Sequence, residues 1–273
     1  MEQYGCAMLE VEFAELSDPG VIRDHNEDYF GSVFPQTPEE VRAQGWLFAL
    51  ADGVGGSQHG EVASSAAVEK VLAGFRRMAS GATLSSVLPR LIQAANTQVF
   101  ETGMATGISG SSMATTIVAC ALRFDRVTVS HVGDSRCYLV RDKVAVALTR
   151  DHTISNEQLR LGLLTAAEAA SAETSHVLSR SIGTNMFVTV DTSEHQLLAG
   201  DILVLCSDGL HHSVLPEDIV QIASAESELS AAARKLVLLA KQRDGSDNIS
   251  IQIIRIRSVE RVGMYRGRHY KIR

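Results

Sequence analysis

Short strand-like segments joined by tight turns constrain the fold of this chain more than any other feature. Apolar and β-branched residues predict strands at 9–16, 29–34, 46–51, 115–122, 126–132, 136–140, 144–148, 188–195, 202–206 and 249–256. Some connections are as short as Arg141-Asp142-Lys143. Because a parallel crossover needs a dozen or more residues, such connections predict antiparallel pairing.

Helical periodicity is confined to a few places. Apolar residues recur on one face over 62–78, 84–99 and 229–240, and Pro216 followed by two acidic residues begins a further short helix. These helices come in pairs between groups of strands and do not alternate with single strands. The pattern therefore predicts an α+β layered fold and not a doubly wound parallel sheet.

The composition is that of an ordinary globular protein. The chain has 273 residues, of which 45% are hydrophobic and 21% charged, enough for a large core. No apolar run is long enough to cross a bilayer, and the N-terminus carries early acids in place of the basic and apolar regions of a signal peptide. Cys6, Cys120, Cys137 and Cys206 form no CxxC pair, so they are interpreted as reduced, mostly buried thiols of a cytoplasmic protein.

Charge is distributed unevenly along the chain. The net charge is −7, but the segment from Arg255 onward carries seven basic residues and one acid, which leaves the remainder with 18 basic and 31 acidic residues. An acidic body argues against nucleic acid as a partner.

We interpret residues 1–257 as a single domain and 258–273 as a solvated basic tail. Within the domain, 151–183 is polar, partly helical at 165–172 and interpreted as an inserted flap, and the Gly- and Ser-rich stretch 103–112 predicts a loop.

Acidic residues stand where apolar strands end or begin. Asp52, Asp134 and Asp208 each follow a predicted strand and precede glycine or another turn-former, and Asp247 precedes a strand. A further group in GVIRDHNEDYF contains Arg23, Glu27 and Asp28. A single Asp-Gly is most often a turn.

Taken together, these acids suggest a site for hard cations. Clustered carboxylates repel each other unless they are solvated or share cations, and a set of oxygen ligands without cysteine suits Mg²⁺ or Mn²⁺. The glycine after Asp52 lets a backbone carbonyl approach a metal closely. Spacing alone does not establish that these loops meet in space.

Seven motifs resemble, in order, those of the metal-dependent serine/threonine phosphatases called the protein phosphatase 2C (PPM) family, in its compact bacterial form. They are RDHNEDYF, ADGVGGSQHGEVAS, SSMATTIVACAL, HVGDSRCYLV with LTRDHT, LSRSIGT, CSDGL and SDNIS, and they cover residues 17–256. The resemblance implies a four-layer α-β-β-α sandwich of two antiparallel sheets flanked by helix pairs. It also implies hydrolysis of phosphoserine and phosphothreonine in proteins, substrates that include a cognate kinase, and a monomeric state.

Roles for individual residues follow from the same resemblance. Asp52 would bridge two Mn²⁺ or Mg²⁺ ions, Asp208 and Asp247 would complete one ion's shell, and Glu27 with the Gly53 carbonyl would serve the other. Asp28 would orient metal-bound water, Arg23 would hold the phosphate, and Asp134 would contribute to a third ion. A water shared by the two ions would attack phosphorus in line.

The sequence departs from the family pattern where a proton donor is expected, and other functions fit parts of it. The family often carries a histidine after the Asp-Gly or the next glycine pair as a proposed acid for the leaving group, and here those positions are Val54 and Ser57. His59 lies close by but is interpreted as a surface-loop residue, which leaves metal-bound water as a source of the proton. His152, His211 and His212 are interpreted as structural.

A dinucleotide-binding GxGxxG motif fails at Gln58, where glycine would be needed, and Cys120–Arg126 has the spacing but not the glycine-rich interior of a cysteine phosphatase loop. A non-catalytic phosphoprotein-binding scaffold and a hydrolase of small phosphoesters stay as alternatives.

Overall fold

Two antiparallel five-stranded sheets form the centre of the molecule. The computed structural model describes residues 8–54, 59–107, 113–265 and 268–271. The first sheet has the order β1 (Glu10–Asp18), β10 (Ile249–Ser258), β9 (Ile202–Cys206), β6 (Arg136–Arg141) and β7 (Val144–Ala147). The second sheet has the order β2 (Asp28–Val33), β3 (Trp46–Asp52), β4 (Ile117–Arg123), β5 (Arg126–Val132) and β8 (Asp191–Gln196).

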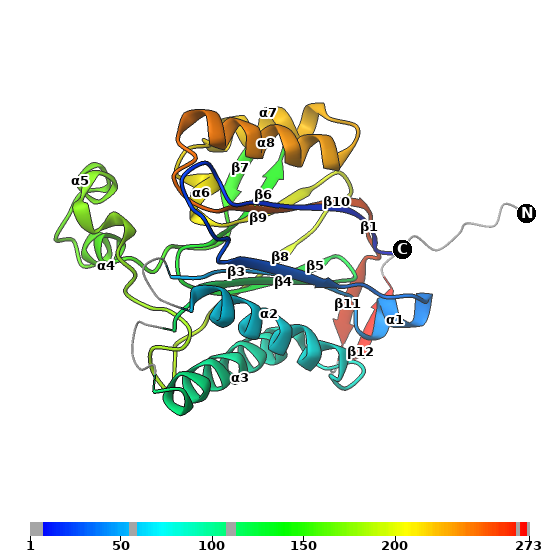
Figure 1. Ribbon diagram of the computed structural model, residues 1–273. Coiled ribbons are helices and arrows are strands. Elements are labelled where there is room, and N and C mark those ends of the chain that lie inside the picture. Colours follow the sequence, from blue (N-terminus) through cyan, green and yellow to red (C-terminus); the bar gives the residue numbers. More distant parts are fainter. Residues whose placement is uncertain (1–7, 55–58, 108–112, 266–267, 272–273) are drawn as a thin grey trace, which may run out of the picture.

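A helix pair covers the outer face of each sheet, and the four layers are seen edge-on in Figure 1. Helices α2 (Gly60–Arg76) and α3 (Leu84–Ala105) lie on the second sheet, while α7 (Pro216–Ala225) and α8 (Leu229–Arg243) lie on the first. Three buried apolar clusters fill the spaces between successive layers. The predicted α-β-β-α sandwich is confirmed.

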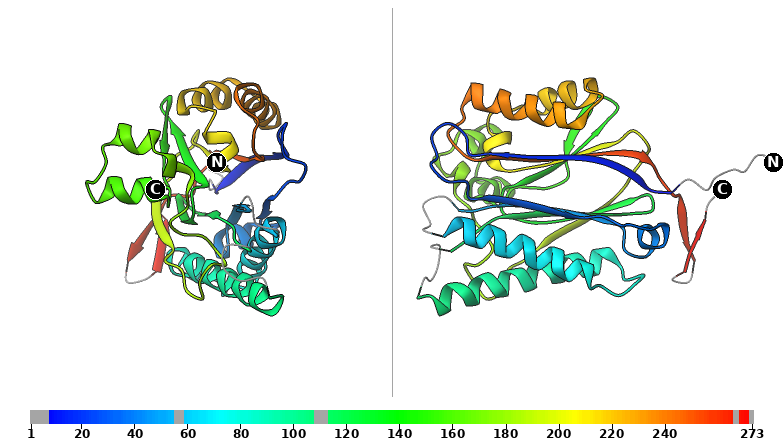
Figure 2. Two further views of the ribbon diagram at one scale, coloured as in Figure 1. Left: turned by 60° about the vertical axis from the view of Figure 1, so that its left-hand side comes forward. Right: turned by 45° about the vertical axis from the view of Figure 1, so that its right-hand side comes forward.

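Smaller helices lie at the two ends of the sandwich. They are α1 (Pro38–Ala43), α4 (Ile154–Arg160), α5 (Ala166–Ser171), the 3₁₀ turn η2 (Glu173–His176) and α6 (Asp208–His211). The flap that contains α4, α5 and η2 projects from one end in Figure 1, and the left view of Figure 2 shows it apart from both helix pairs. No helix within the described ranges is long and apolar enough to cross a membrane.

The structure differs from the sequence prediction in a few elements. Strand β8 begins at Asp191 and not at Val188, because the backbone just before it is bound by side chains: the Val188 N–H donates to Gln93 Oε1 and the Thr189 carbonyl accepts from Arg180. Helix α3 runs to Ala105, past the start of the loop predicted at 103–112, and residues 108–112 of that loop lie outside the described residues.

The C-terminal segment is not simply a solvated tail. Strand β10 extends to Ser258, and β11 (Val262–Tyr265) pairs with β12 (Arg268–Lys271) as an antiparallel hairpin. This hairpin lies at the end of the sandwich opposite the flap (Figure 1). Three of the four cysteines, Cys120, Cys137 and Cys206, are free and buried as predicted, and Cys6 lies outside the described residues.

Candidate metal centre

Strand register brings the predicted carboxylates to one end of the sandwich. The first residue of β2, Asp28, pairs directly with the last residue of β3, Asp52. In the other sheet β9 ends at Cys206 where β10 begins, so Asp208 and Asp247 stand just beyond two neighbouring strands. The Ser207 hydroxyl donates to Asp28 Oδ2 at 2.8 Å and joins the two sheets at this point.

A cleft of about 480 Å³ opens at this end of the molecule, beside the flap. Six of the eight residues that the sequence singled out line it, namely Arg23, Asp52, Gly53, Asp134, Asp208 and Asp247. Asp28 is buried beside Ser207, and Glu27 sits against the start of α2. The loops that spacing alone could not bring together therefore converge.

The carboxylates raise one another's pKa values. Burial, reinforced by Asp28 and Asp208, raises the pKa of Asp52 well above its ordinary value. Burial and the neighbouring Asp208 raise the pKa of Asp134 to about 8. The pKa of Asp28 is raised to about 7, mainly by burial, against hydrogen bonds from Ser250 and Ser207. Buried like charges of this kind are stable as anions only when cations are shared between them.

The donor set fits a hard divalent cation. Four aspartates and the Gly53 backbone line the cleft, and no cysteine is among its described lining residues. Oxygen ligands of this type suit Mg²⁺ or Mn²⁺ and not zinc. Asp28 Oδ1, which is buried without a hydrogen-bond partner, also indicates that a further polar group belongs beside it.

Two glycines make room for Glu27. A Cβ on Gly53 would lie 2.6 Å from the carbonyl carbon of Gly60, and a Cβ on Gly60 would lie 2.8 Å from Glu27 Oε2. The Gly53 N–H also donates to the Glu27 carbonyl at 3.1 Å. Close packing of this loop on the start of α2 therefore fixes the Glu27 carboxylate next to the Gly53 peptide.

Arg23 lies at the mouth of the cleft. Its Nη2 donates to Asp247 Oδ2 at 2.7 Å, with both side chains partly exposed. The hydrogen bond to Asp247 raises the guanidinium pKa further. A permanently charged, planar donor at this position can present its remaining N–H groups to a phosphate.

Asn248 organises the centre, although only its neighbour was given a role from the sequence. Its Oδ1 accepts from the Glu27 N–H at 2.8 Å, and its Nδ2 donates to the carbonyls of Pro19 and His25 at 3.0 and 2.9 Å. These bonds fasten the loop that carries Arg23 and Glu27 to the start of β10. The signal was present in SDNIS, but an amide side chain after an acid is also typical of an ordinary turn.

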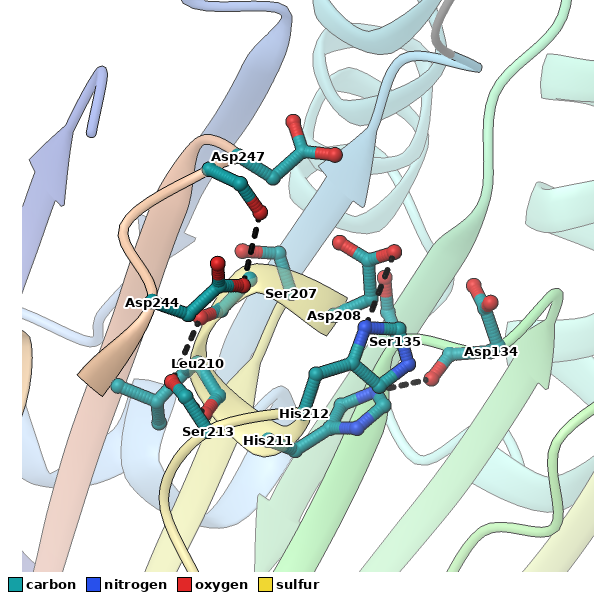
Figure 3. A network of polar contacts seen from close by, with 12 residues as sticks. Asp134, Ser135, Ser207, Asp208, Leu210, His211, His212, Ser213, Asp244 and Asp247 are labelled. Carbon is teal, nitrogen blue, oxygen red and sulfur yellow. Dashed lines mark hydrogen bonds and ion pairs between the residues drawn. The ribbon is translucent and has the colours of Figure 1, made fainter. Parts of the chain in front are cut away.

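Two histidines contact the aspartates of the candidate centre. His211 Nε2 contacts the Asp134 carbonyl at 3.0 Å, and His212 Nδ1 lies 3.7 Å from Asp208 Oδ2, as Figure 3 shows. Burial lowers the pKa of both rings. The His212 ring also meets the flap residue His176 edge to face, with ring centroids 4.5 Å apart. Sequence reasoning missed His176, which lines the cleft.

The structural interpretation of His152 is supported by its contacts. Its Nδ1 accepts from the Gly133 N–H at 3.1 Å, and its ring stacks on His131 with centroids 4.6 Å apart. Burial lowers its pKa to about 4, so the ring is neutral near pH 7. Its Nε2 lies 3.4 Å from Asp191 Oδ2, and neither of these two residues is among the described lining of the cleft.

Comparisons with known proteins agree with this geometry. The model of the family Protein phosphatase 2C matches residues 22–249. The serine/threonine phosphatase stp of Listeria innocua is 33% identical over 258 residues, which is 92% of this chain and 96% of that protein. The serine/threonine protein phosphatase PstP of Mycobacterium tuberculosis is 32% identical over 246 residues, covering 90% of this chain and 45% of that protein.

Solved structures show the same architecture. The serine/threonine phosphatase of S. agalactiae superposes with a TM-score of 0.82 at 32% identity, covering 90% of this chain and all of that chain. The catalytic domain of PstP in complex with two manganese ions superposes with a TM-score of 0.77 at 28% identity, covering 92% of this chain and all of that one. The chain is therefore a member of the protein phosphatase 2C family.

Proposed function

We propose that this protein hydrolyses phosphoserine and phosphothreonine in other proteins with the help of two Mn²⁺ or Mg²⁺ ions. The observation that carries the proposal is the convergence of carboxylates from both sheets on one cleft, with an arginine at its mouth. Family membership and the names of the relatives support the same activity. The ions would lower the pKa of the attacking water and neutralise the phosphoryl oxygens.

Each carboxylate receives a role in this proposal. Asp52 would contribute to holding both ions, Asp208 and Asp247 would hold one of them, and the Glu27 carboxylate and Gly53 carbonyl would hold the other. The positions of these residues support the assigned roles. Asp52 pairs with Asp28 and interacts with Asp208, and Glu27 is packed beside Gly53. Asp134 lines the same cleft and is proposed to hold a third ion.

Asp28 and Arg23 act without holding an ion. Asp28 is fixed by the Ser207 hydroxyl and offers its free Oδ1 to orient the attacking water. Arg23 binds the phosphate oxygens and keeps phosphorus in line with that water. No cysteine nucleophile is needed, since Cys137 and Cys206 are buried and burial contributes to raising their thiol pKa values.

Substrate, domain and location follow as further proposals. The cleft is lined in part by flap residues and is open to solvent, which suits a phosphorylated segment of a protein, including a cognate serine/threonine kinase. We assign catalysis to a single domain over residues 1–257 that acts as a monomer, with 151–183 as its flap. Free buried cysteines support a reducing, cytoplasmic location.

The proposal is tested by titrating Mn²⁺ into a phosphothreonine-peptide assay with the full chain. We expect turnover to appear with Mn²⁺ and vanish in excess chelator. Asp208→Asn should abolish most turnover while leaving the folded state intact, because it removes a ligand charge and keeps the shape. Asp142→Asn is the matched control, since Asp142 lies in the β6–β7 turn at a positive φ that asparagine tolerates. Turnover that survives chelation would refute the metal mechanism.

The same assay separates the alternatives. A non-catalytic scaffold would bind the phosphopeptide without turnover at any Mn²⁺ concentration. A hydrolase of small phosphoesters would act on p-nitrophenyl phosphate and leave phosphoproteins intact. The presence of every carboxylate of the proposed centre in or beside one cleft favours catalysis.

A further inference from the structure

Cleavage of a serine or threonine phosphate leaves an alkoxide-like oxygen that needs a proton. The cleft contains few groups that can supply one near neutral pH. The guanidinium of Arg23 does not deprotonate, the hydroxyls of Thr116, Ser181 and Thr184 are too weakly acidic, and Val54 carries no proton donor. The carboxyl groups are committed to cations in the proposed function. Among the described lining residues this leaves one imidazole, that of His176.

His176 is exposed, and the backbone that follows it is hydrogen-bonded to the first residues of the flap, which are tied to the body by the His152 N–H donating to the Gly133 carbonyl at 3.0 Å. His176 is the last residue of η2. On its C-terminal side, the Val177 carbonyl accepts from the Ile154 N–H at 2.8 Å, and the Ser179 N–H donates to the His152 carbonyl at 2.8 Å. A residue placed by such bonds is held in position before substrate arrives, which is what efficient proton transfer requires.

The His176 ring is also oriented by packing. It meets the His212 ring edge to face at 4.5 Å, and His212 in turn lies beside Asp208. His176 itself lines the cleft together with Asp208 and Asp134. Edge-to-face packing of two aromatic rings favours one side-chain orientation over the others.

We propose that His176 is the general acid that protonates the leaving seryl or threonyl oxygen. The inference rests on the proposed phosphatase function and adds a residue to it. In the step, the water oxygen forms a bond to phosphorus as the bond from phosphorus to the side-chain oxygen breaks. That oxygen takes the proton from the His176 imidazolium, and the proton lost by the water passes to solvent. The neutral imidazole then regains a proton from solvent, so the net reaction consumes one water and yields alcohol and phosphate.

The test compares leaving groups in His176→Gln. General acid catalysis contributes about 10²- to 10⁴-fold, so kcat on a phosphothreonine peptide should fall by that factor. The loss should shrink, to under about tenfold, on p-nitrophenyl phosphate, because its phenolate departs without a proton. KM for the peptide should change little. His195→Gln is the matched control, since His195 lies in β8 and contacts Ser193, not the cleft.

Two further measurements distinguish a proton donor at His176 from a metal ligand and from a second candidate acid. Mn²⁺ affinity measured by calorimetry should be the same in His176→Gln and the unaltered protein, and a tenfold weaker affinity would make His176 a metal ligand instead. Asp134→Asn tests the rival proton donor, because it would show the leaving-group dependence if Asp134 were the acid. Equal losses on both substrates, or no loss on the peptide, would overturn the proposal. Absence of peptide turnover in the unaltered protein with Mn²⁺ would instead refute the phosphatase function.

Discussion

Replacing Asp28 by asparagine should stabilise the protein when metal is absent. The Asp28 side chain is buried, its Oδ2 accepts from Ser207, and its Oδ1 has no partner. Asparagine has nearly the same shape, can still accept the Ser207 hydrogen bond and carries no charge. The substitution therefore removes the cost of a buried anion while keeping the packing.

The magnitude follows from proton linkage. Burial raises the pKa of Asp28 from 3.8 to about 7, so the folded protein binds this proton more tightly than the unfolded chain does. Protonated Asp28 makes its full contribution to the free energy of unfolding at low pH. That contribution is lost as the pH rises from about 4 to about 7. Above pH 7 the cost of ionising this group is on the order of 4 kcal/mol, of which roughly 2.5 kcal/mol is lost between pH 5 and pH 7.5.

The assay is urea unfolding in excess chelator at pH 5 and pH 7.5. Asp28→Asn should exceed the unaltered protein in free energy of unfolding, and by more at pH 7.5 than at pH 5. With saturating Mn²⁺ the advantage of the variant should narrow by about 1.4–2.7 kcal/mol, because the variant cannot orient the water beside the ions and its metal affinity should fall about 10- to 100-fold. If the difference between the two proteins in chelator were the same at both pH values, the linkage argument would be wrong.

Three further perturbations probe the packing around the same centre. Gly60→Ala places a Cβ 2.8 Å from the Glu27 carboxylate, so Mn²⁺ affinity measured by calorimetry should weaken about 10- to 100-fold while unfolding in chelator changes little. Ser207→Ala removes the donor to Asp28 and should cost about 1–3 kcal/mol in urea unfolding with Mn²⁺ present; an unchanged midpoint would contradict that. Phe75→Ala empties a fully buried position between α2 and the second sheet and should cost about 3–5 kcal/mol without altering the Mn²⁺ concentration for half-maximal turnover.

The layers of the fold could be predicted from the sequence because they depend on local periodicity and short connections. The helical stripes and the short strand connections concern residues close together in the chain, whereas the order of seven motifs over residues 17–256 predicted the overall architecture through the family resemblance. The hairpin β11–β12 was missed because alternation over four residues per strand in a basic segment is too weak a signal. The start of β8 was misplaced because Gln93 and Arg180, distant in sequence, bind the backbone that a strand partner would otherwise bind.

The candidate centre was only partly predictable, for a similar reason. Asp52 and Asp208 stand out because acids at strand ends followed by glycine are conspicuous in the sequence. His176 does not, since it lies in a polar segment with no periodicity, and its place beside His212 depends on how the flap folds back. The role of Asn248 likewise depends on partners more than 200 positions earlier in the chain.

The position of the carboxylates across two sheets has a mechanical consequence. Asp52 ends a strand of the second sheet, whereas Asp208 and Asp247 flank strands of the first, and an apolar layer lies between the sheets. Apolar contacts have no preferred direction, so this layer opposes sliding of one sheet over the other mainly through the packing of its side chains. Ions held from both sides would stop that sliding at one end. The loaded protein should therefore be stiffer under shear than the chelated one, and chelation should loosen the sandwich first at the end that carries the flap.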